Sequence, residues 1–121
     1  MSAHFFDTNI VIDWLNRRLP AKAELSRYAR HRISRITWAE VLAGEPLETR
    51  DHVRGLIAPF EIVEADGRIA QAAADIRHRT AMKLLDALIL ATAHINGSIL
   101  VTRNTRDFPA VMPGIRIPYT L

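Results

Sequence analysis

The sequence contains no cysteine, which excludes disulfides, cysteine-bound zinc, iron–sulfur clusters and thiol nucleophiles. It has no uninterrupted apolar run near the roughly 18 residues that a membrane-spanning helix requires, and no basic segment followed by an apolar one near its start. No repeat, low-complexity tract or linker rich in proline, glycine or serine divides the chain. We therefore expect residues 1–121 to form one domain of a cytoplasmic protein with no membrane partner.

Lysine is scarce, because Lys22 and Lys83 are the only two among 16 basic residues and the others are arginines. Thirteen acidic residues leave a net charge of +3 and a pI near 9.9. Guanidinium groups bind phosphate through two parallel hydrogen bonds, so an arginine-rich surface suits nucleic acid. A solvated surface without such a partner explains a net charge this small equally well.

Several catalytic and binding motifs are missing, among them a glycine-rich nucleotide-binding loop and a Gly-x-Ser-x-Gly nucleophile turn. A receiver domain or an aspartyl-phosphate phosphatase needs a further acid near the first strand and a late lysine. Position 9 is Asn9 and the last lysine is Lys83, so neither pattern is present. The histidines have no metal-binding spacing and are interpreted as surface or core residues: His4, His31, His52, His78 and His94.

Hydrophobic periodicity predicts short strands that alternate with helices. The expected strands cover residues 4–6, 32–35, 60–63, 98–101 and 114–117. The first expected helix starts at residue 7 and ends before Pro20, and the others cover residues 21–30, 37–42, 51–57, 69–79 and 84–95. This order predicts an α/β fold, a three-layer sandwich in which helices flank a mostly parallel sheet. In such sheets functional groups gather beyond the carboxyl ends of the strands.

Four acidic residues stand beside strongly apolar sequence: Asp7, Glu40, Asp86 and Asp107. Burying a carboxylate is costly unless a cation or hydrogen bonds compensate, so each of the four needs an explanation. Two of them follow the most clearly predicted strands, where a parallel sheet brings strand ends together. Other acids fall in polar stretches and need no explanation: Glu24, Glu45, Glu48, Asp51 and Glu61.

Each of the four acids also has a purely structural explanation. Asp7 is a suitable helix cap, and Thr37 with Glu40 matches a capping box, in which two side chains satisfy free backbone amides at a helix start. Asp86 falls in the first turn of a helix, where the helix dipole favours negative charge, and Asp107 suits a turn. These explanations suffice one at a time, but the four positions together favour a shared site.

A carboxylate cluster without cysteine or paired histidines indicates a hard cation that prefers oxygen ligands, Mg²⁺ or Mn²⁺. In a basic protein such a pocket suggests hydrolysis of a phosphodiester. The ion polarises the phosphoryl oxygen, lowers the pKa of a bound water and neutralises the charge that develops.

Four segments resemble the motifs of PIN-domain ribonucleases in order and spacing: residues 5–9 (FFDTN), 36–44 (ITWAEVLAG), 85–93 (LDALILATA) and 100–108 (LVTRNTRDF). The chain length is similar to that of VapC-type toxins of bacterial toxin–antitoxin pairs. The resemblance implies a PIN fold, magnesium-dependent cleavage of RNA, frequent homodimerisation and inhibition by a cognate VapB-like antitoxin. Position 104 is Asn104, where many relatives carry aspartate, so either Asn104 or Asp107 fills the fourth position of the site.

We predict that Asp7 and Asp86 hold the ion most directly, since a strand end and a buried helix are rigid positions. Glu40 is expected to orient a water or a second ion, and Asp107 to supply the fourth corner. Supporting polar residues are Thr8, Asn9, Thr37 and Asn104, and the arginines expected to bind RNA are Arg103 and Arg106. For Arg103, an ion pair with a neighbouring acid explains the sequence equally well. The alternative function is a catalytically silent PIN-like domain that binds RNA or a protein.

Overall fold

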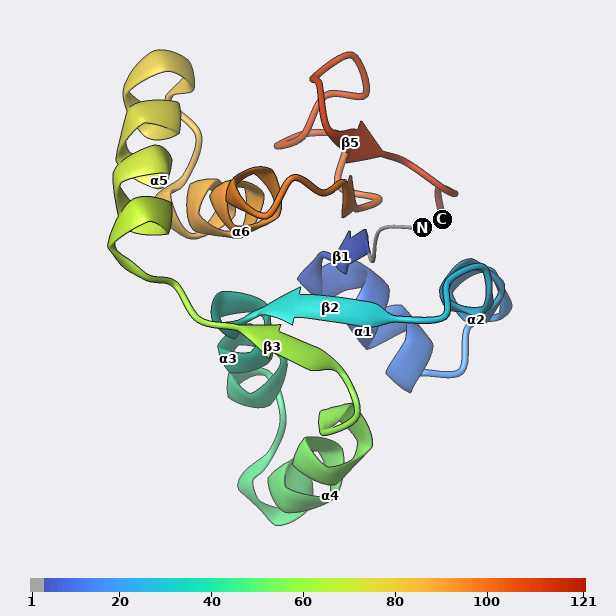
Figure 1. Cartoon of the computed structure of the whole chain (residues 1–121). Helices are drawn as coiled ribbons and strands as arrows, with labels where there is room; N and C mark the ends of the chain where they lie inside the picture. The colour runs from blue at the N-terminus through green and yellow to red at the C-terminus, as the bar shows by residue number, and fades with distance from the viewer. Residues whose placement is uncertain (1–3) are drawn as a thin grey trace.

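The computed structural model describes residues 4–121. Its centre is a five-stranded sheet with the order β3-β2-β1-β4-β5, in which every neighbouring pair of strands is parallel (Figure 1). The strands are β1 (His4–Phe6), β2 (His31–Ser34), β3 (Glu61–Val63), β4 (Leu100–Val101) and β5 (Ile115–Arg116). The α/β class and the parallel sheet are therefore confirmed.

Helices cover both faces of the sheet. The two helices α5 and α6 pack on one face, and α1 to α4 pack on the other (Figure 1). Their bounds are α1 (Thr8–Leu15), α2 (Leu19–Ser26), α3 (Arg35–Ala43), α4 (Leu47–Ile57), α5 (Gly67–Thr80) and α6 (Leu84–Ile95). None of these helices, within residues 4–121, is long and apolar enough to cross a membrane.

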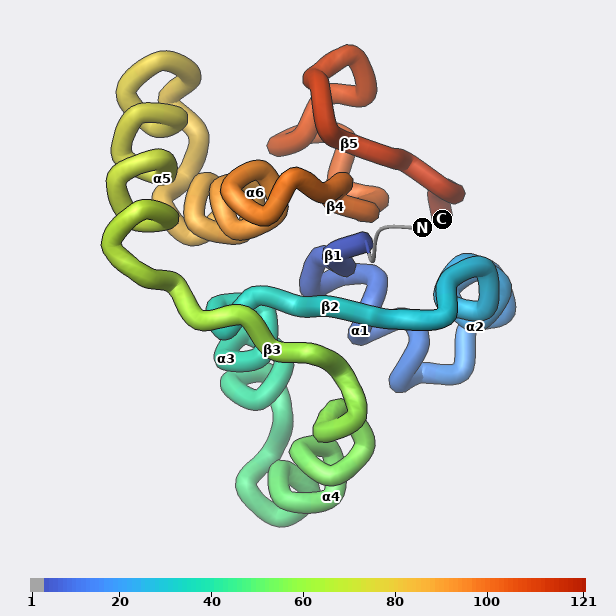
Figure 2. Tube along the Cα trace, in the orientation of Figure 1, coloured from blue at the N-terminus to red at the C-terminus, as the bar shows by residue number. Residues whose placement is uncertain are grey.

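The central strands β1 and β4 divide their side chains between two cores. Phe5 pairs with Leu100 and Phe6 with Val101, so segments almost 100 residues apart in the chain lie side by side (Figure 2). Because successive strand residues point to opposite faces, the first pair packs against α5 and α6 and the second against α1, α3 and α4. Both faces of these strands are buried, and their carboxyl ends lead directly into Asp7 and Thr102.

Two of the helices that begin earlier than predicted, α2 and α4, have a proline at their start. α2 begins at Leu19, with Pro20 in its first turn, where the N–H that proline lacks has no helical partner in any case. It also ends at Ser26 rather than at residue 30. α4 begins at Leu47, directly after Pro46, rather than at residue 51. The prediction treated both prolines as breaks, whereas proline also favours the start of the helix that follows.

Candidate active site

Asp7 lies at the carboxyl end of β1 and is the N-cap of α1. Only 4% of its surface is exposed. Its Oδ1 accepts a hydrogen bond from the backbone N–H of Thr8 at 2.8 Å. Its Oδ2 accepts from the hydroxyl of Thr102 at 2.7 Å and from the amide of Asn9 at 3.2 Å. The capping role is thus real, but each hydrogen-bond donor to Asp7 within residues 4–121 is neutral, and a buried carboxylate with only neutral donors retains an uncompensated charge.

The environment of Asp7 disfavours its charged form. Burial raises the pKa of Asp7 from 3.8 to about 6, against the opposing effect of the hydrogen bonds from Thr102 and Thr8. The nearby carboxylates of Asp86 and Glu40 raise this pKa further by charge repulsion. The three predicted acids Asp7, Glu40 and Asp86 therefore lie near enough to influence one another.

Glu40 lies on α3 and contacts the first turn of α1, because the hydroxyl of Thr8 donates to its Oε1. The predicted capping box of Thr37 and Glu40 is wrong. The N-cap of α3 is Ser34, whose hydroxyl accepts from the backbone N–H of Thr37 at 3.0 Å. Thr37 is fully buried within that first turn, and its hydroxyl lies 3.4 Å from that of Thr8. The carboxylate of Glu40 is therefore directed to the start of α1 and not to the start of its own helix, α3. We call Asp7, Glu40, Asp86 and Asp107 the acid cluster.

Asp86 occupies the first turn of α6, as predicted, and is half-buried. Burial raises the pKa of Asp86, and the carboxylates of Asp107 and Glu40 raise it further. The positive charge of Lys83 acts against this shift. The charge of Asp86 is therefore coupled to those of Asp7 and Glu40 and also to that of Asp107, the fourth predicted acid.

Asp107 and Asn104 lie next to each other in the turn that follows β4. The side-chain amide of Asn104 donates to Oδ2 of Asp107 at 2.8 Å, and the backbone N–H of Asp107 donates to Oδ1 of Asn104 at 3.2 Å. Asn104 thus fixes the turn, and Asp107 carries the charge that acts on Asp86. Both residues predicted for the fourth position lie at this edge of the site, each in a distinct role.

The guanidinium of Arg103 forms an ion pair with Asp13, which is the alternative to RNA binding that the sequence left open. Its Nε and Nη2 atoms donate to the two carboxylate oxygens of Asp13 at 2.6 and 3.0 Å. The hydroxyl of Tyr119 donates to the same carboxylate at 2.9 Å. Burial favours the neutral form of Asp13, but the bonds from Arg103 and Tyr119 outweigh it and lower the pKa of Asp13 below its ordinary value.

Two buried acids were missed by the sequence analysis. Asp13 is 2% exposed and Glu24 is 5% exposed. Asp13 lies between Ile12 and Trp14 in an apolar helix, so the criterion applied to Asp86 would also have selected it. The interpretation of Glu24 as part of a polar stretch is wrong, because its carboxylate accepts two bonds from Arg116, at 2.7 and 3.0 Å. That arginine lies 92 residues away, and no local pattern indicates it.

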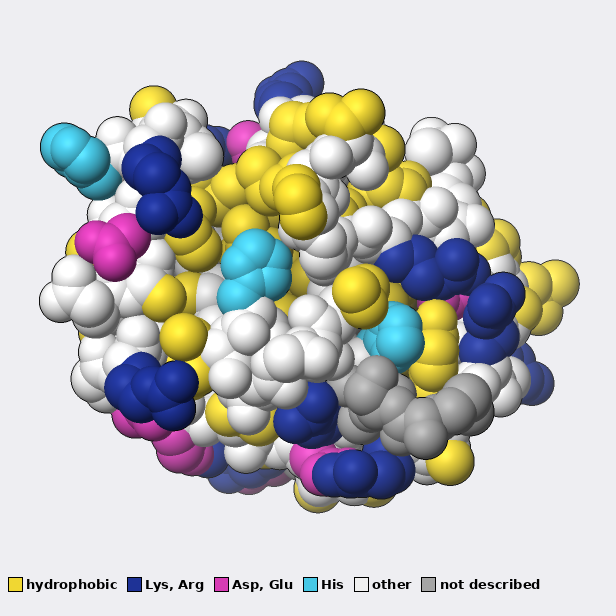
Figure 3. Space-filling view, turned by 45° about the horizontal axis from the view of Figure 1, so that its top comes forward, with side chains coloured by type: hydrophobic (Ala, Val, Ile, Leu, Met, Phe, Trp, Pro, Cys, Tyr) yellow, Lys and Arg dark blue, Asp and Glu magenta, His cyan; other side chains and the backbone are white. Residues whose placement is uncertain are grey.

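The arginine surface is divided rather than continuous. Figure 3 shows lysine and arginine side chains in separate groups on one face, several of them beside acids. Ion pairs with Asp or Glu occupy Arg18, Arg27, Arg30, Arg35, Arg54, Arg103 and Arg116. Arg106 is exposed and forms no ion pair within residues 4–121. Of the two arginines predicted to bind RNA, Arg106 is the one whose guanidinium is open to solvent.

The four acids offer only oxygen ligands, the donor set that Mg²⁺ and Mn²⁺ prefer. Within residues 4–121, no group of three or more Asp, Glu or His side chains is arranged to hold an ion by itself. Mg²⁺ commonly binds only one or two protein carboxylates and completes its octahedral shell with water and substrate phosphates. Asp7 and Asp86, whose charges repel each other, fit such a partial site.

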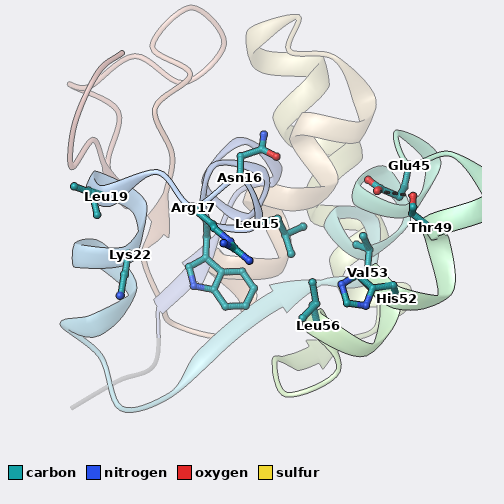
Figure 4. Close-up of a pocket in the computed structure, with 11 residues that line it drawn as sticks. Leu15, Asn16, Arg17, Leu19, Lys22, Glu45, Thr49, His52, Val53 and Leu56 are labelled. Carbon is teal, nitrogen blue, oxygen red and sulfur yellow. Dashed lines mark hydrogen bonds between the residues drawn. The ribbon is translucent and has the colours of Figure 1, made fainter.

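A groove of about 750 Å³ lies between the end of α1, α2 and α4 (Figure 4). Leu15 and Leu19 contribute from one side, and Val53 and Leu56 from α4 on the other. Leu19 is 74% exposed and Leu56 is 42% exposed, so both leave apolar surface open to solvent at the groove. Polar residues also line the groove: Asn16, Arg17, Lys22, Glu45, Thr49 and His52. None of the four acids of the site is among its lining residues.

Comparison with known proteins places this chain in a family. The model of the PIN domain matches residues 4–112. A toxin–antitoxin complex from Klebsiella pneumoniae contains a similar chain, with 37% identity over 98% of this chain and 100% of that one, and a TM-score of 0.91. The DNA-bound VapBC of Salmonella typhimurium has 29% identity over 97% of each chain and a TM-score of 0.79. FitAcB of Neisseria gonorrhoeae has 26% identity, covers 97% and 99%, and has a TM-score of 0.76.

The chain therefore belongs to the PIN-domain family. Its similarity to the VapC-type toxins, expected from the four motifs, is confirmed by these structures. Comparison with curated protein sequences gives no match.

Proposed function

We propose that this protein is a metal-dependent endoribonuclease that acts as the toxin of a toxin–antitoxin pair. The observation that carries the proposal is the buried carboxylate of Asp7, whose hydrogen-bond donors in the described part of the chain are all neutral and which lies near Asp86 and Glu40. A protein maintains such repulsion at a cost to its stability, and a bound cation removes it. The PIN family and the toxin–antitoxin matches support this reading of the cluster.

In this proposal Asp7 and Asp86 hold Mg²⁺, or Mn²⁺, from β1 and α6. The ion, when bound, polarises the scissile phosphate and makes water a better nucleophile. Glu40 is held by the hydroxyl of Thr8, so its second oxygen is available to orient the attacking water and to accept its proton. Asp107, fixed by Asn104, closes the fourth side of the site.

The remaining predicted residues support this arrangement. Asn9 donates to both Asp7 and Thr102, which fixes the oxygen of Asp7 that both contact. Thr37 supports Thr8, the residue that holds Glu40. We propose Arg106 as the contact to an RNA phosphate, because its guanidinium is free of ion pairs within the described part of the chain.

We further propose that a VapB-like antitoxin inhibits this chain and that the chain forms a homodimer. The similar chains from Klebsiella pneumoniae and Salmonella typhimurium come from a toxin–antitoxin complex and a VapBC complex. The groove between α1, α2 and α4 offers apolar side chains that a partner segment would bury, with Arg17 and Lys22 beside them for an acidic partner. A short reading frame for a DNA-binding protein next to this gene would support the pairing.

The test is cleavage of a structured RNA by the purified chain in Mg²⁺, in Mn²⁺ and in EDTA, together with the Asp86→Asn variant. We expect cleavage that requires the metal and falls at least ~100-fold in the variant. A folded wild-type chain that binds RNA but leaves it intact in both metals would favour the catalytically silent alternative instead.

A further inference from the structure

The ion pair of Arg103 and Asp13 lies outside the acid cluster but is joined to it through the backbone. Asp13 comes from the last turn of α1, and Arg103 lies 90 residues later, directly beyond β4. The carboxylate of Asp13 accepts the two guanidinium bonds and the hydroxyl of Tyr119, so three distant parts of the chain meet at one buried charge. We call these three residues, Asp13, Arg103 and Tyr119, the anchor.

Arg103 is flanked on both sides by residues that orient acids of the site. Thr102, before it, donates its hydroxyl to Oδ2 of Asp7 at 2.7 Å. Asn104, after it, donates to Oδ2 of Asp107 at 2.8 Å. The backbone N–H of Arg103 itself donates to Oδ1 of Asn9 at 3.2 Å. A shift of the backbone at position 103 therefore moves the donors of two carboxylates together.

We propose that Asp13 and Tyr119, acting through Arg103, are positioning residues that fix Thr102 and Asn104 and thereby orient the carboxylates of Asp7 and Asp107. This inference rests on the proposed metal-dependent function. It assigns Arg103 to the architecture of the site rather than to RNA. Groups that orient metal-binding side chains typically change metal affinity or activity by 10- to 100-fold when removed, because small displacements of reacting groups are costly.

The chain contains a second buried acid that accepts three hydrogen bonds of the same kind, two from an arginine and one from a tyrosine. Glu24 accepts two bonds from the guanidinium of Arg116 and one from the hydroxyl of Tyr28, at 3.0 Å. Like Asp13, Glu24 is on a helix and nearly fully buried. Arg116 is linked to Thr102 by a backbone hydrogen bond of the sheet, in which the N–H of Thr102 donates to the carbonyl oxygen of Arg116 at 3.0 Å. Changes at this second cluster therefore have similar structural effects without releasing the side chain of Arg103.

The experiment compares Tyr119→Phe with Tyr28→Phe. Each variant removes one tyrosine hydroxyl that donates a hydrogen bond to a buried carboxylate. Mg²⁺ affinity is measured from the rise of Tm with Mg²⁺ concentration, and kcat and KM are measured with an RNA substrate at two salt concentrations. We expect Tyr119→Phe to weaken Mg²⁺ binding and to lower kcat by about 10-fold, with KM for RNA and its salt dependence unchanged. Tyr28→Phe is expected to stay within about twofold of wild type in all three quantities.

Asp13→Asn and Glu24→Gln form a second, stronger pair. Loss of a buried charge partner destabilises both variants, and only Asp13→Asn is expected to lose Mg²⁺ affinity as well. Should Asp13→Asn fail to fold, the tyrosine pair decides the question. Equal effects of Tyr119→Phe and Tyr28→Phe on Mg²⁺ affinity and kcat would overturn the anchor's positioning role. A change confined to KM and its salt dependence would also overturn it, and would return Arg103 to RNA binding. A wild-type chain with no response to Mg²⁺ would overturn the proposed function itself.

Discussion

At the residue scale, the raised pKa of Asp7 links the stability of the fold to pH. The folded chain binds a proton at Asp7 with a pKa of about 6, against 3.8 for the ordinary side chain. The folded state is therefore favoured by protonation, and this contribution is full below pH 4 and is lost as pH rises through 6. Asp13 and Glu24 have pKa values that are lowered by their arginines and tyrosines. Their charged forms therefore stabilise the fold, and this contribution is lost only as pH falls below about 4.

The first prediction uses this separation of pH windows. In EDTA, the free energy of unfolding of wild type should fall relative to that of Asp7→Asn by about 2 kcal/mol between pH 4.5 and pH 7. Urea unfolding of both proteins at the two pH values measures the difference, in which the histidines common to both cancel. A difference that does not change with pH would show that Asp7 titrates normally.

The second prediction concerns Asp86, which repels Asp107 and Glu40 and has Lys83 as its opposing cation. Asp86→Asn removes this repulsion, so we expect Tm in EDTA to rise by ~1–4 °C. The same variant should lose the increase in Tm that Mg²⁺ gives wild type. Thermal unfolding with EDTA and with Mg²⁺ measures both effects. A lower Tm in EDTA would instead assign Asp86 to the stability of the α6 start.

The third prediction separates Glu40 from the helix cap. Glu40→Gln keeps an oxygen for the hydroxyl of Thr8 and leaves the Ser34 cap intact, so Tm should barely change while cleavage of RNA falls about 100-fold. Ser34→Ala is the matched control, because it removes the cap at a cost of about 1 kcal/mol and leaves the carboxylate in place. A stability loss for Glu40→Gln as large as that for Ser34→Ala would contradict this assignment.

At the scale of elements, local sequence patterns predicted most strands and helices, and they failed where two signals competed. Ser34 and Thr37 are both good caps, and Glu40 at the right spacing favoured Thr37. The strand β2 ends at Ser34, however, so the chain turns into α3 three residues earlier. Topology predicted that Asp7, after β1, and Asp107, in the turn after β4, lie at the same edge of the sheet, since parallel strands bring their carboxyl ends together.

Local sequence patterns could not predict the two buried ion pairs, Asp13 with Arg103 and Glu24 with Arg116. Asp13 is 90 residues from Arg103, and Glu24 is 92 residues from Arg116. Helical periodicity shows which residues share a face, but it carries no information on a partner that tertiary contacts bring from another element. The role of Arg103 was left open between RNA and an acid for this reason, and only the fold distinguishes the two at the level of contacts.

The fourth prediction concerns the groove formed by α1, α2 and α4. Leu56→Asp and Leu19→Asp place a charge among its apolar side chains, so we expect the cognate antitoxin to inhibit each variant at least ~10-fold less effectively. RNA cleavage by the free variants should stay at the wild-type level, since the groove does not include the four acids. Leu121→Asp, at another exposed leucine outside the groove, is the control. Unchanged inhibition would place the antitoxin elsewhere.

At the scale of the whole molecule, the distribution of charge differs from what composition suggests. The net charge of +3 comes with many arginines already paired with acids, and the face drawn in Figure 3 carries its basic side chains in separate groups. The unusual feature is instead a group of acids at one edge of the sheet, within a basic protein. Acids within a basic protein suit a substrate whose phosphates bind a metal ion that these acids also hold.

The most direct test of this account is to locate Mn²⁺ in crystals of the protein by its anomalous scattering. The account predicts a peak between the carboxylates of Asp7 and Asp86, with Glu40 and Asp107 around it. The peak should be absent from crystals of Asp86→Asn soaked in the same way. Full soaking with no peak at these carboxylates, or a peak elsewhere on the chain, would contradict the claim that the acid cluster is a metal site.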